Sequence, residues 1–321
     1  MNRLRLLAAA LILGLLVVSC GQRSSSDPGA YPQDQIRLIV PYVAGGPTDI
    51  AARSLGRFMQ QRLGQTVVVE NEPGASGSTA YKHLISAKPD GYTLSMSALP
   101  TAVLNYLIND VGYTRASFAP VGVITQVPSA LVVPASSPYP NLAALFADAR
   151  ANPGKVTVAT PGSTNTHASE TRRATKLYGV PLTVLPFNGN PEVLTALLGG
   201  NTVAGFVNVS QDMLPAIESG DLRVLAVGTA ARLPYLDAPT FVEQGFPELT
   251  QSTTTFGVIA PAGTPDPVIK KLEEVMRAAS ADPEVVRALD ARYVPKQFVG
   301  STELAGLFER TEQTFRGIAG G

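Results

Sequence analysis

Glycine and hydroxyl-bearing residues recur in four short segments that could bind a small ligand. The segments are Tyr42–Thr48, Asn71–Gly77, Thr160–Thr166 and Phe206–Ser210. Glycine lets the backbone approach a ligand closely. The first three segments each precede an expected helix, whose free N–H groups and dipole attract anions. Because the segments are nearly free of basic side chains, they favour a small carboxylate held by amides and hydroxyls.

The same segments lack several enzyme motifs. Ala44-Gly45-Gly46 has no following Gly-Lys-Ser/Thr, so it is not a P-loop. Gly74–Ser78 ends in serine, where a nucleophile elbow needs glycine. A Ser–His–Asp triad would need one of the two histidines. His83 is expected on a solvated helix face. His167 is expected in a structural or capping role, with ligand contact as the alternative. A secreted α/β hydrolase is therefore disfavoured, and we expect no catalytic residue, cofactor or metal.

The first twenty residues indicate export. Arg3 and Arg5 precede the uncharged run Leu6–Val18, which is too short to span a bilayer, and Ser19–Cys20 follows. This predicts a lipoprotein signal peptide over 1–19 and lipid attachment at Cys20, the single cysteine of the chain. Ordinary signal-peptide cleavage with an incidental cysteine is the alternative. Residues 20–33, rich in serine and glycine, would then tether the folded part to a membrane.

The composition narrows the possible partners. Of 321 residues, 45% are apolar and 16% charged, with 25 basic residues against 25 acidic ones. The core can be large, and no basic patch marks a nucleic-acid binder. We expect a monomer in the cell envelope.

The elements that must position these segments alternate between strands and helices. Runs such as Gln35–Pro41 and Lys155–Ala159 predict buried strands, and Asp49–Leu63 has helical spacing that ends at Gly64. Two such α/β halves are expected, each a mostly parallel sheet flanked by helices. The chain is expected to cross between them at Pro120–Pro134 and Thr253–Pro261. This gives domain 1 as 34–130 plus 256–321 and domain 2 as 131–255.

An ordered set of motifs resembles the substrate receptors of tripartite tricarboxylate transporters, known as Bug-type receptors. The set begins at Tyr31-Pro32 and runs to the C-terminal part of the chain. Its members are Ile36–Tyr42 with Gly45–Asp49, Val68–Gly77, Lys88–Leu94, Asn152–Lys155, Pro186–Gly189, Leu197–Gly200, Ala238–Thr240 with Glu243 and Gly245, and Ala260–Pro265. Each motif is weak alone, and the order makes the set specific.

The resemblance implies a two-lobed periplasmic-binding-protein (Venus flytrap) fold and a membrane transporter as partner. It also implies that the Gly-Gly-x-x-Asp and Asn-x-x-Gly-Ala loops carry the ligand's carboxylate, partly through water, while the second lobe sets ligand choice. The candidate residues are Tyr42, Ala44, Gly45, Gly46, Thr48, Asp49, Gly74, Ala75, Ser76, Gly77 and Ser97 in the first lobe and Ser163, Thr164, Thr166, Asn208 and Ser210 in the second. A receptor that feeds a sensor protein is the alternative function.

Two acids in these loops raise separate questions. Asp49 is expected to cap or shape its loop, with a direct ligand role as the alternative. Glu72 stands where relatives often have arginine. It is expected to point outward to solvent, and the alternative is contact with a positive group on the ligand, such as an amine.

Overall fold

The structure is a computed structural model that describes residues 31–250 and 252–319. The expected signal peptide 1–19, the lipid site Cys20 and residues 21–30 of the tether lie outside these ranges. Within the described ranges, no helix combines the length and the apolar character needed to cross a membrane.

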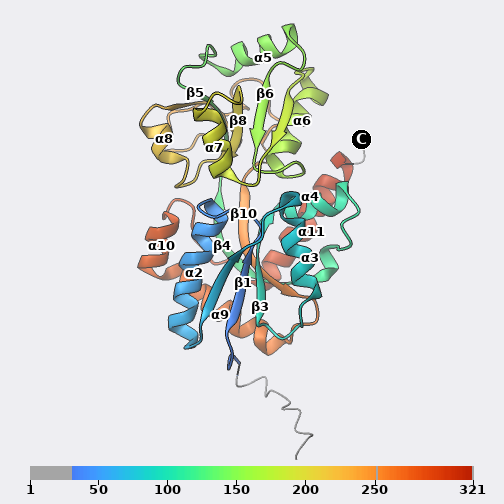
Figure 1. Ribbon diagram of the computed structural model, residues 1–321, viewed down its shortest axis with the longest axis vertical. Helices are drawn as coiled ribbons and strands as arrows, with labels where there is room; N and C mark the ends of the chain where they lie inside the picture. Colours follow the sequence, from blue (N-terminus) through green and yellow to red (C-terminus); the bar gives the residue numbers. More distant parts are fainter. Residues whose placement is uncertain (1–30, 251, 320–321) are drawn as a thin grey trace, which may run out of the picture. The chain divides into compact units, whose positions relative to one another are not determined.

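One sheet contains five strands in the described part of the chain, in the order β2-β1-β3-β10-β4. The strands are β1 (Ile36–Val40), β2 (Val67–Asn71), β3 (Thr93–Leu99), β4 (Phe118–Val127) and β10 (Thr254–Pro261). Two groups of helices lie on either side of it (Figure 1). The groups are α2 (Pro47–Leu63), α9 (Asp266–Ala281) and α10 (Pro283–Leu289), and α3 (Ser78–Ser86), α4 (Thr101–Ile108) and α11 (Ser301–Ala319). We call this sheet and its helices lobe 1.

A second sheet, likewise five-stranded within residues 31–250, has the order β7-β6-β8-β5-β9. Its strands are β5 (Ser129–Pro134), β6 (Thr157–Thr160), β7 (Thr183–Pro186), β8 (Ala204–Asn208) and β9 (Leu222–Val227). The accompanying helices are α5 (Leu142–Ala151), α6 (Thr166–Tyr178), α7 (Asn190–Leu198) and α8 (Leu214–Glu218). We call this sheet and its helices lobe 2. The expected α/β fold with two lobes is confirmed.

Each sheet has one reversed strand. β10 runs antiparallel to β3 and β4, and β5 runs antiparallel to β8 and β9, whereas the other pairs in the described sheets are parallel. These are the strands by which the chain enters one lobe from the other. The chain arrives at the edge where the parallel strands end, so the entering strand runs away from that edge. The sheets are therefore mixed, with one direction dominant.

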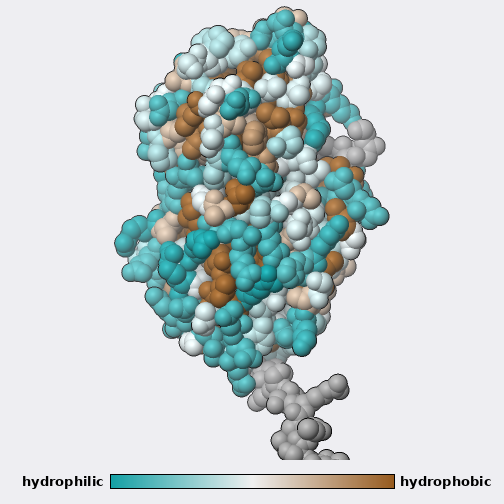
Figure 2. All heavy atoms as spheres, viewed as in Figure 1, coloured by the Kyte–Doolittle hydropathy of each residue, from teal (hydrophilic) through white to brown (hydrophobic). Residues whose placement is uncertain are grey.

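The cores of the lobes form separate clusters of buried side chains. In lobe 1, Tyr81 of α3, Val103 of α4 and Phe308 of α11 pack together against the sheet. In lobe 2, Phe146 of α5 and Phe206 of β8 belong to the corresponding cluster. On the face shown in Figure 2, apolar residues appear at the surface only in small patches among hydrophilic ones. Burial against its own sheet therefore supports each lobe.

The local predictions hold where the sequence pattern is strong. Gly64 ends α2 with a φ of 69°, as its position after the apolar stripe predicted. The segment Pro120–Pro134, expected only as a crossing, forms strands in both sheets, β4 and β5. Gly189 is the N-cap of α7, and the amide of the next residue, Asn190, turns toward the end of β8.

Candidate functional site

A small cavity lies where the carboxyl ends of strands from both lobes meet. Its volume is about 30 Å³. Lobe 1 contributes Tyr42, Val43, Gly46, Pro47, Thr48, Ala98, Thr101, Thr254 and Phe256, and lobe 2 contributes Pro161, Asn165, His167, Gly189, Asn190 and Asn208. A cavity that accepts benzene measures about 150 Å³. A small organic acid can therefore enter only if the lobes separate.

The beginnings of helices from both lobes form much of the wall. Among the described residues, the lining includes the starts of α2, α4, α6 and α7, where Gly46, Asn165 and Gly189 are the N-caps of α2, α6 and α7. The first N–H groups of a helix have no partner within it, and the dipole makes this end positive. Several such ends directed at one cavity make it an anion site.

The described part of the lining is uncharged. Among the described residues that line the cavity, there is no Arg, Lys, Asp or Glu. An anionic ligand would therefore be held by dipoles and hydrogen bonds rather than by an ion pair.

Asp49, just behind the cavity, is paired within the protein. Its carboxylate accepts hydrogen bonds from Gly45 N, Arg53 Nε and Asn71 Nδ2, each at 2.9 Å. Asn71 Nδ2 also donates to Tyr42 O at 3.1 Å. Burial raises the pKa of Asp49, but these hydrogen bonds and the Arg53 charge outweigh it and hold the pKa below its usual value. Asp49 thus shapes the loop that lines the cavity, and Arg53 offsets its charge.

Ser76 connects the lobes beside the cavity. Its Oγ accepts hydrogen bonds from Ser163 N at 2.9 Å and Thr164 N at 3.1 Å. Asn105 supports the contact, because its Nδ2 donates to Ser76 O and its Oδ1 accepts from the Thr164 hydroxyl. Gly162 permits this approach, since a Cβ there would lie 2.7 Å from Ser76 Oγ. These residues hold the lobes together.

The structure brings only part of the expected set to the cavity wall. Tyr42, Gly46, Thr48 and Asn208 line it, whereas Ser76, Ser163 and Thr164 form the contact between lobes. The expected residues outside the lining also include Ala44, Gly45, Gly74, Ala75, Gly77, Ser97, Thr166 and Ser210.

Ser97 precedes a lining residue on the same strand but is not part of the described lining. Ala98 lines the cavity, and neighbouring side chains of a strand point to opposite faces. Ser97 therefore faces away from the side that Ala98 presents.

Several lining residues were not among the expected site residues, although four of them, Val43, Pro47, Pro161 and Asn165, lie within the expected segments Tyr42–Thr48 and Thr160–Thr166. They are Val43, Pro47, Ala98, Thr101, Pro161, Asn165, Gly189, Asn190, Thr254 and Phe256. The signal for Asn165 was present, because an asparagine directly before a helical pattern often caps the helix, and its side chain accepts from Ala168 N. Thr254 and Phe256 had no local signal, because they enter the site through the reversed strand β10.

His167 is the lining residue whose side chain titrates nearest neutral pH when free. Its Nε2 lies 2.8 Å from Ser129 Oγ, and the residue is 3% exposed. Burial lowers the pKa of His167 to about 3, so the ring is neutral at neutral pH. The position of His167 in the cavity wall supports the alternative in which it contacts the ligand.

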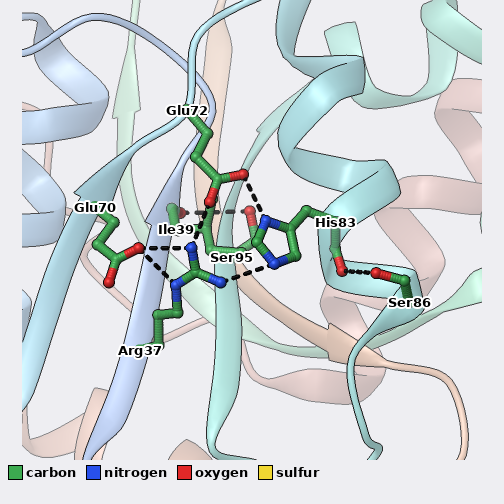
Figure 3. Close-up of polar contacts among 7 residues, drawn as sticks. All are labelled: Arg37, Ile39, Glu70, Glu72, His83, Ser86 and Ser95. Atoms are coloured by element: carbon green, nitrogen blue, oxygen red, sulfur yellow. Dashed lines mark hydrogen bonds and ion pairs between the residues drawn. The ribbon is translucent and has the colours of Figure 1, made fainter.

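Glu72 lies in neither of the expected environments. Arg37 Nη2 donates to its Oε1 at 2.7 Å, and His83 Nδ1 lies 2.9 Å from its Oε2. Arg37 also binds Glu70 and reaches His83 Nε2 (Figure 3). The Glu72 side chain is 19% exposed. It is thus neither free in solvent nor part of the cavity lining, and His83 is partnered rather than merely solvated.

The described residues offer no metal centre: in residues 31–250 and 252–319, no group of three or more His, Cys, Asp or Glu is placed to hold an ion.

Comparisons with known proteins agree with this geometry. The model of the tripartite tricarboxylate transporter family receptor matches residues 51–310. The protein BugT of Bordetella pertussis is 32% identical over 99% of this chain and 97% of its own length.

Two solved structures from Rhodopseudomonas palustris are also similar. MatC with bound malate is 27% identical with a TM-score of 0.84, covering 90% of this chain and 100% of its own. A protein solved with adipate is 30% identical with a TM-score of 0.82, covering 90% of this chain and 97% of its own. The two mixed sheets, the cavity between them and these matches agree, and the chain belongs to the tripartite tricarboxylate transporter family receptors, a family of substrate-binding receptors.

Proposed function

We propose that the protein captures a small organic carboxylate between its lobes and delivers it to a tripartite tricarboxylate-type membrane transporter. The observation that carries this is the meeting of helix N-termini at a cavity whose described lining has no charged side chain. Such a wall binds a carboxylate through N–H groups. The malate and adipate bound by the two similar structures are carboxylates too.

Capture requires the lobes to open and close. The cavity of about 30 Å³ is too small for these acids, and the hydrogen bond from Thr164 N to Ser76 Oγ supports the view that the lobes are closed here. We propose that domain 1 (34–130 plus 256–321) and domain 2 (131–255) move about the segments that join them. The protein acts as a monomer, since one chain supplies both walls.

Calorimetric titration of the purified protein with mono-, di- and tricarboxylates tests the proposal. Each acid is paired with its neutral amide as a matched control. The acid should bind and the amide should not, because the helix N-termini favour negative charge. Binding of the amides with no binding of any acid would refute carboxylate capture. Loss of uptake of the bound acid in cells that lack the protein supports transport, and intact uptake with a lost transcriptional response supports the sensing alternative.

We also propose that Cys20 carries a lipid that anchors the protein in the cell envelope. The support comes from the sequence, in which Cys20 directly follows the uncharged run and Ser19. Mass spectrometry of the membrane fraction tests it: unmodified Cys20 in the mature protein contradicts the anchor.

A further inference from the structure

Among the described residues of lobe 2 that line the cavity, two buried acceptor atoms have no hydrogen-bond partner in the protein. They are Nδ1 of His167, at the start of α6, and Oδ1 of Asn190, at the start of α7. Both residues line the cavity and are 2–3% exposed. Buried polar atoms are nearly always paired, so an unpaired one calls for an explanation.

The hydrogen bonds around Ser129 decide which nitrogen of His167 carries the proton. Ser129 Oγ donates its single proton to Ser252 O at 2.5 Å and accepts from Asn208 Nδ2 at 3.1 Å. Its 2.8 Å contact with His167 Nε2 must therefore be donated by the ring. The proton is on Nε2, and Nδ1 keeps a free lone pair. Burial, which lowers the pKa of His167 to about 3, keeps Nδ1 unprotonated at neutral pH.

A hydrogen bond likewise determines the orientation of the Asn190 amide. Its Nδ2 lies 3.1 Å from Asn208 O, a carbonyl that can only accept. The nitrogen must face Asn208, so the atom left without a partner is the oxygen, an acceptor. Lobe 2 thus contributes acceptors to a wall that otherwise offers N–H donors to a carboxylate.

We propose that the ligand is a hydroxycarboxylate whose hydroxyl donates a hydrogen bond to His167 Nδ1 or Asn190 Oδ1. This deepens the proposed function and rests on it. A carboxylate alone has no proton to give and would leave both acceptors unpaired. An ammonium group has protons but adds a positive charge, and no Asp or Glu lies among the described lining residues to pair with it. A hydroxyl supplies the donor without the charge.

The test measures affinities for acids that differ by one hydroxyl. Succinate is compared with malate, and glutarate with 2-hydroxyglutarate, by calorimetry on the purified wild-type protein at neutral pH. Aspartate, the amino counterpart of malate, is the third probe. In each pair we expect the hydroxylated acid to bind at least about tenfold more tightly, equal to about 1.4 kcal/mol.

A variant then locates the discrimination. His167→Gln keeps an N–H for Ser129 and removes the Nδ1 acceptor, so the preference should fall to about threefold or less. His83→Gln makes the same exchange in the Arg37–Glu72 network and should leave the preference unchanged.

The outcomes separate the two proposals. Equal binding of both members of a pair overturns the hydroxyl inference and leaves carboxylate capture standing. Tighter binding of aspartate than of malate overturns the choice of hydroxyl over amine, and an unchanged preference in folded His167→Gln overturns the role of Nδ1. Binding of no acid at all refutes carboxylate capture and this inference with it. Because the wild-type ratios need no variant, they decide even if His167→Gln fails to fold.

Discussion

Closure of the lobes can be blocked at one glycine without changing either lobe internally. Gly189 of lobe 2 faces Val43 of lobe 1, and Val43 N donates to Asn188 O at 3.4 Å. A Cβ at Gly189 would lie 2.8 Å from Val43 Cγ2. The backbone at Gly189 is extended, with φ 168° and ψ 172°, so alanine introduces no backbone strain there. Gly189→Ala should therefore act through the contact between lobes rather than through the backbone of lobe 2.

The expected loss of affinity follows from the overlap between the added methyl group and Val43. Inserting a methyl group into packed surroundings costs about 1–3 kcal/mol. The lobes can relieve it by parting, so the cost appears in closure rather than in unfolding. The affinity for the acid that binds most tightly should fall about 5- to 150-fold. The free energy of unfolding of the ligand-free protein should change by less than about 0.5 kcal/mol.

A double-mutant cycle tests the mechanism. Val43→Ala removes the methyl group that Gly189→Ala meets, so the double variant should recover most of the affinity. Gly306→Ala, in α11, is the control, because its added Cβ would meet only the end of the Arg310 side chain. Calorimetry gives the affinities, and small-angle scattering with saturating ligand gives the degree of closure. Wild-type affinity in Gly189→Ala, or no recovery in the double variant, would show that this contact does not govern closure.

Four further results are expected. His167 has a pKa of about 3 in the folded protein and 6.5 when free, so the unfolded chain takes up a proton first as pH falls. The free energy of unfolding should therefore decrease below about pH 6.5, by up to about 1.4 kcal/mol per pH unit. Urea unfolding of His167→Gln should lack this pH dependence. Asp49→Ala should lower the unfolding free energy by about 2 kcal/mol through lost charged hydrogen bonds, and an unchanged melting temperature contradicts this. Glu72→Gln should lower the free energy of unfolding by at most about 1 kcal/mol, because it breaks the ion pair with Arg37. The affinity for every acid should stay unchanged, and an altered affinity would mean that Glu72 reaches the ligand. Cys20→Ala should move the protein from the membrane fraction to the soluble one, and an unchanged distribution argues against the anchor.

The parts that were predictable from the sequence are those that depend on neighbouring residues. The apolar run in β1 and the glycine that ends α2 are local signals, and both elements were expected within a few residues of their true bounds. Three of the loops were likewise expected to precede helices, whose first N–H groups attract anions. Local signals thus sufficed for these elements, and the loops remain the predicted place of the site.

What could not be predicted depends on residues distant in the sequence. Glu72 is neutralised by Arg37 of a neighbouring strand, and its own neighbours give no sign of that ion pair. The unpaired Nδ1 of His167 becomes apparent only from two contacts of Ser129. The Ser129 hydroxyl donates its proton to Ser252 O, so the other ring nitrogen, Nε2, must donate to Ser129. Donor and acceptor roles of this kind require the three-dimensional arrangement.

The order of strands in lobe 1 also determines when that lobe can fold. β10 lies between β3 and β4, yet it follows the whole of lobe 2 in the chain. The strands of lobe 2, β5 to β9, are consecutive, so its sheet can form as soon as β9 is available. As the chain emerges N-terminus first, β3 and β4 lack the strand that joins them until Thr254–Pro261 has followed. Lobe 2 therefore completes its sheet first, and lobe 1 keeps unpaired strand edges open for longest.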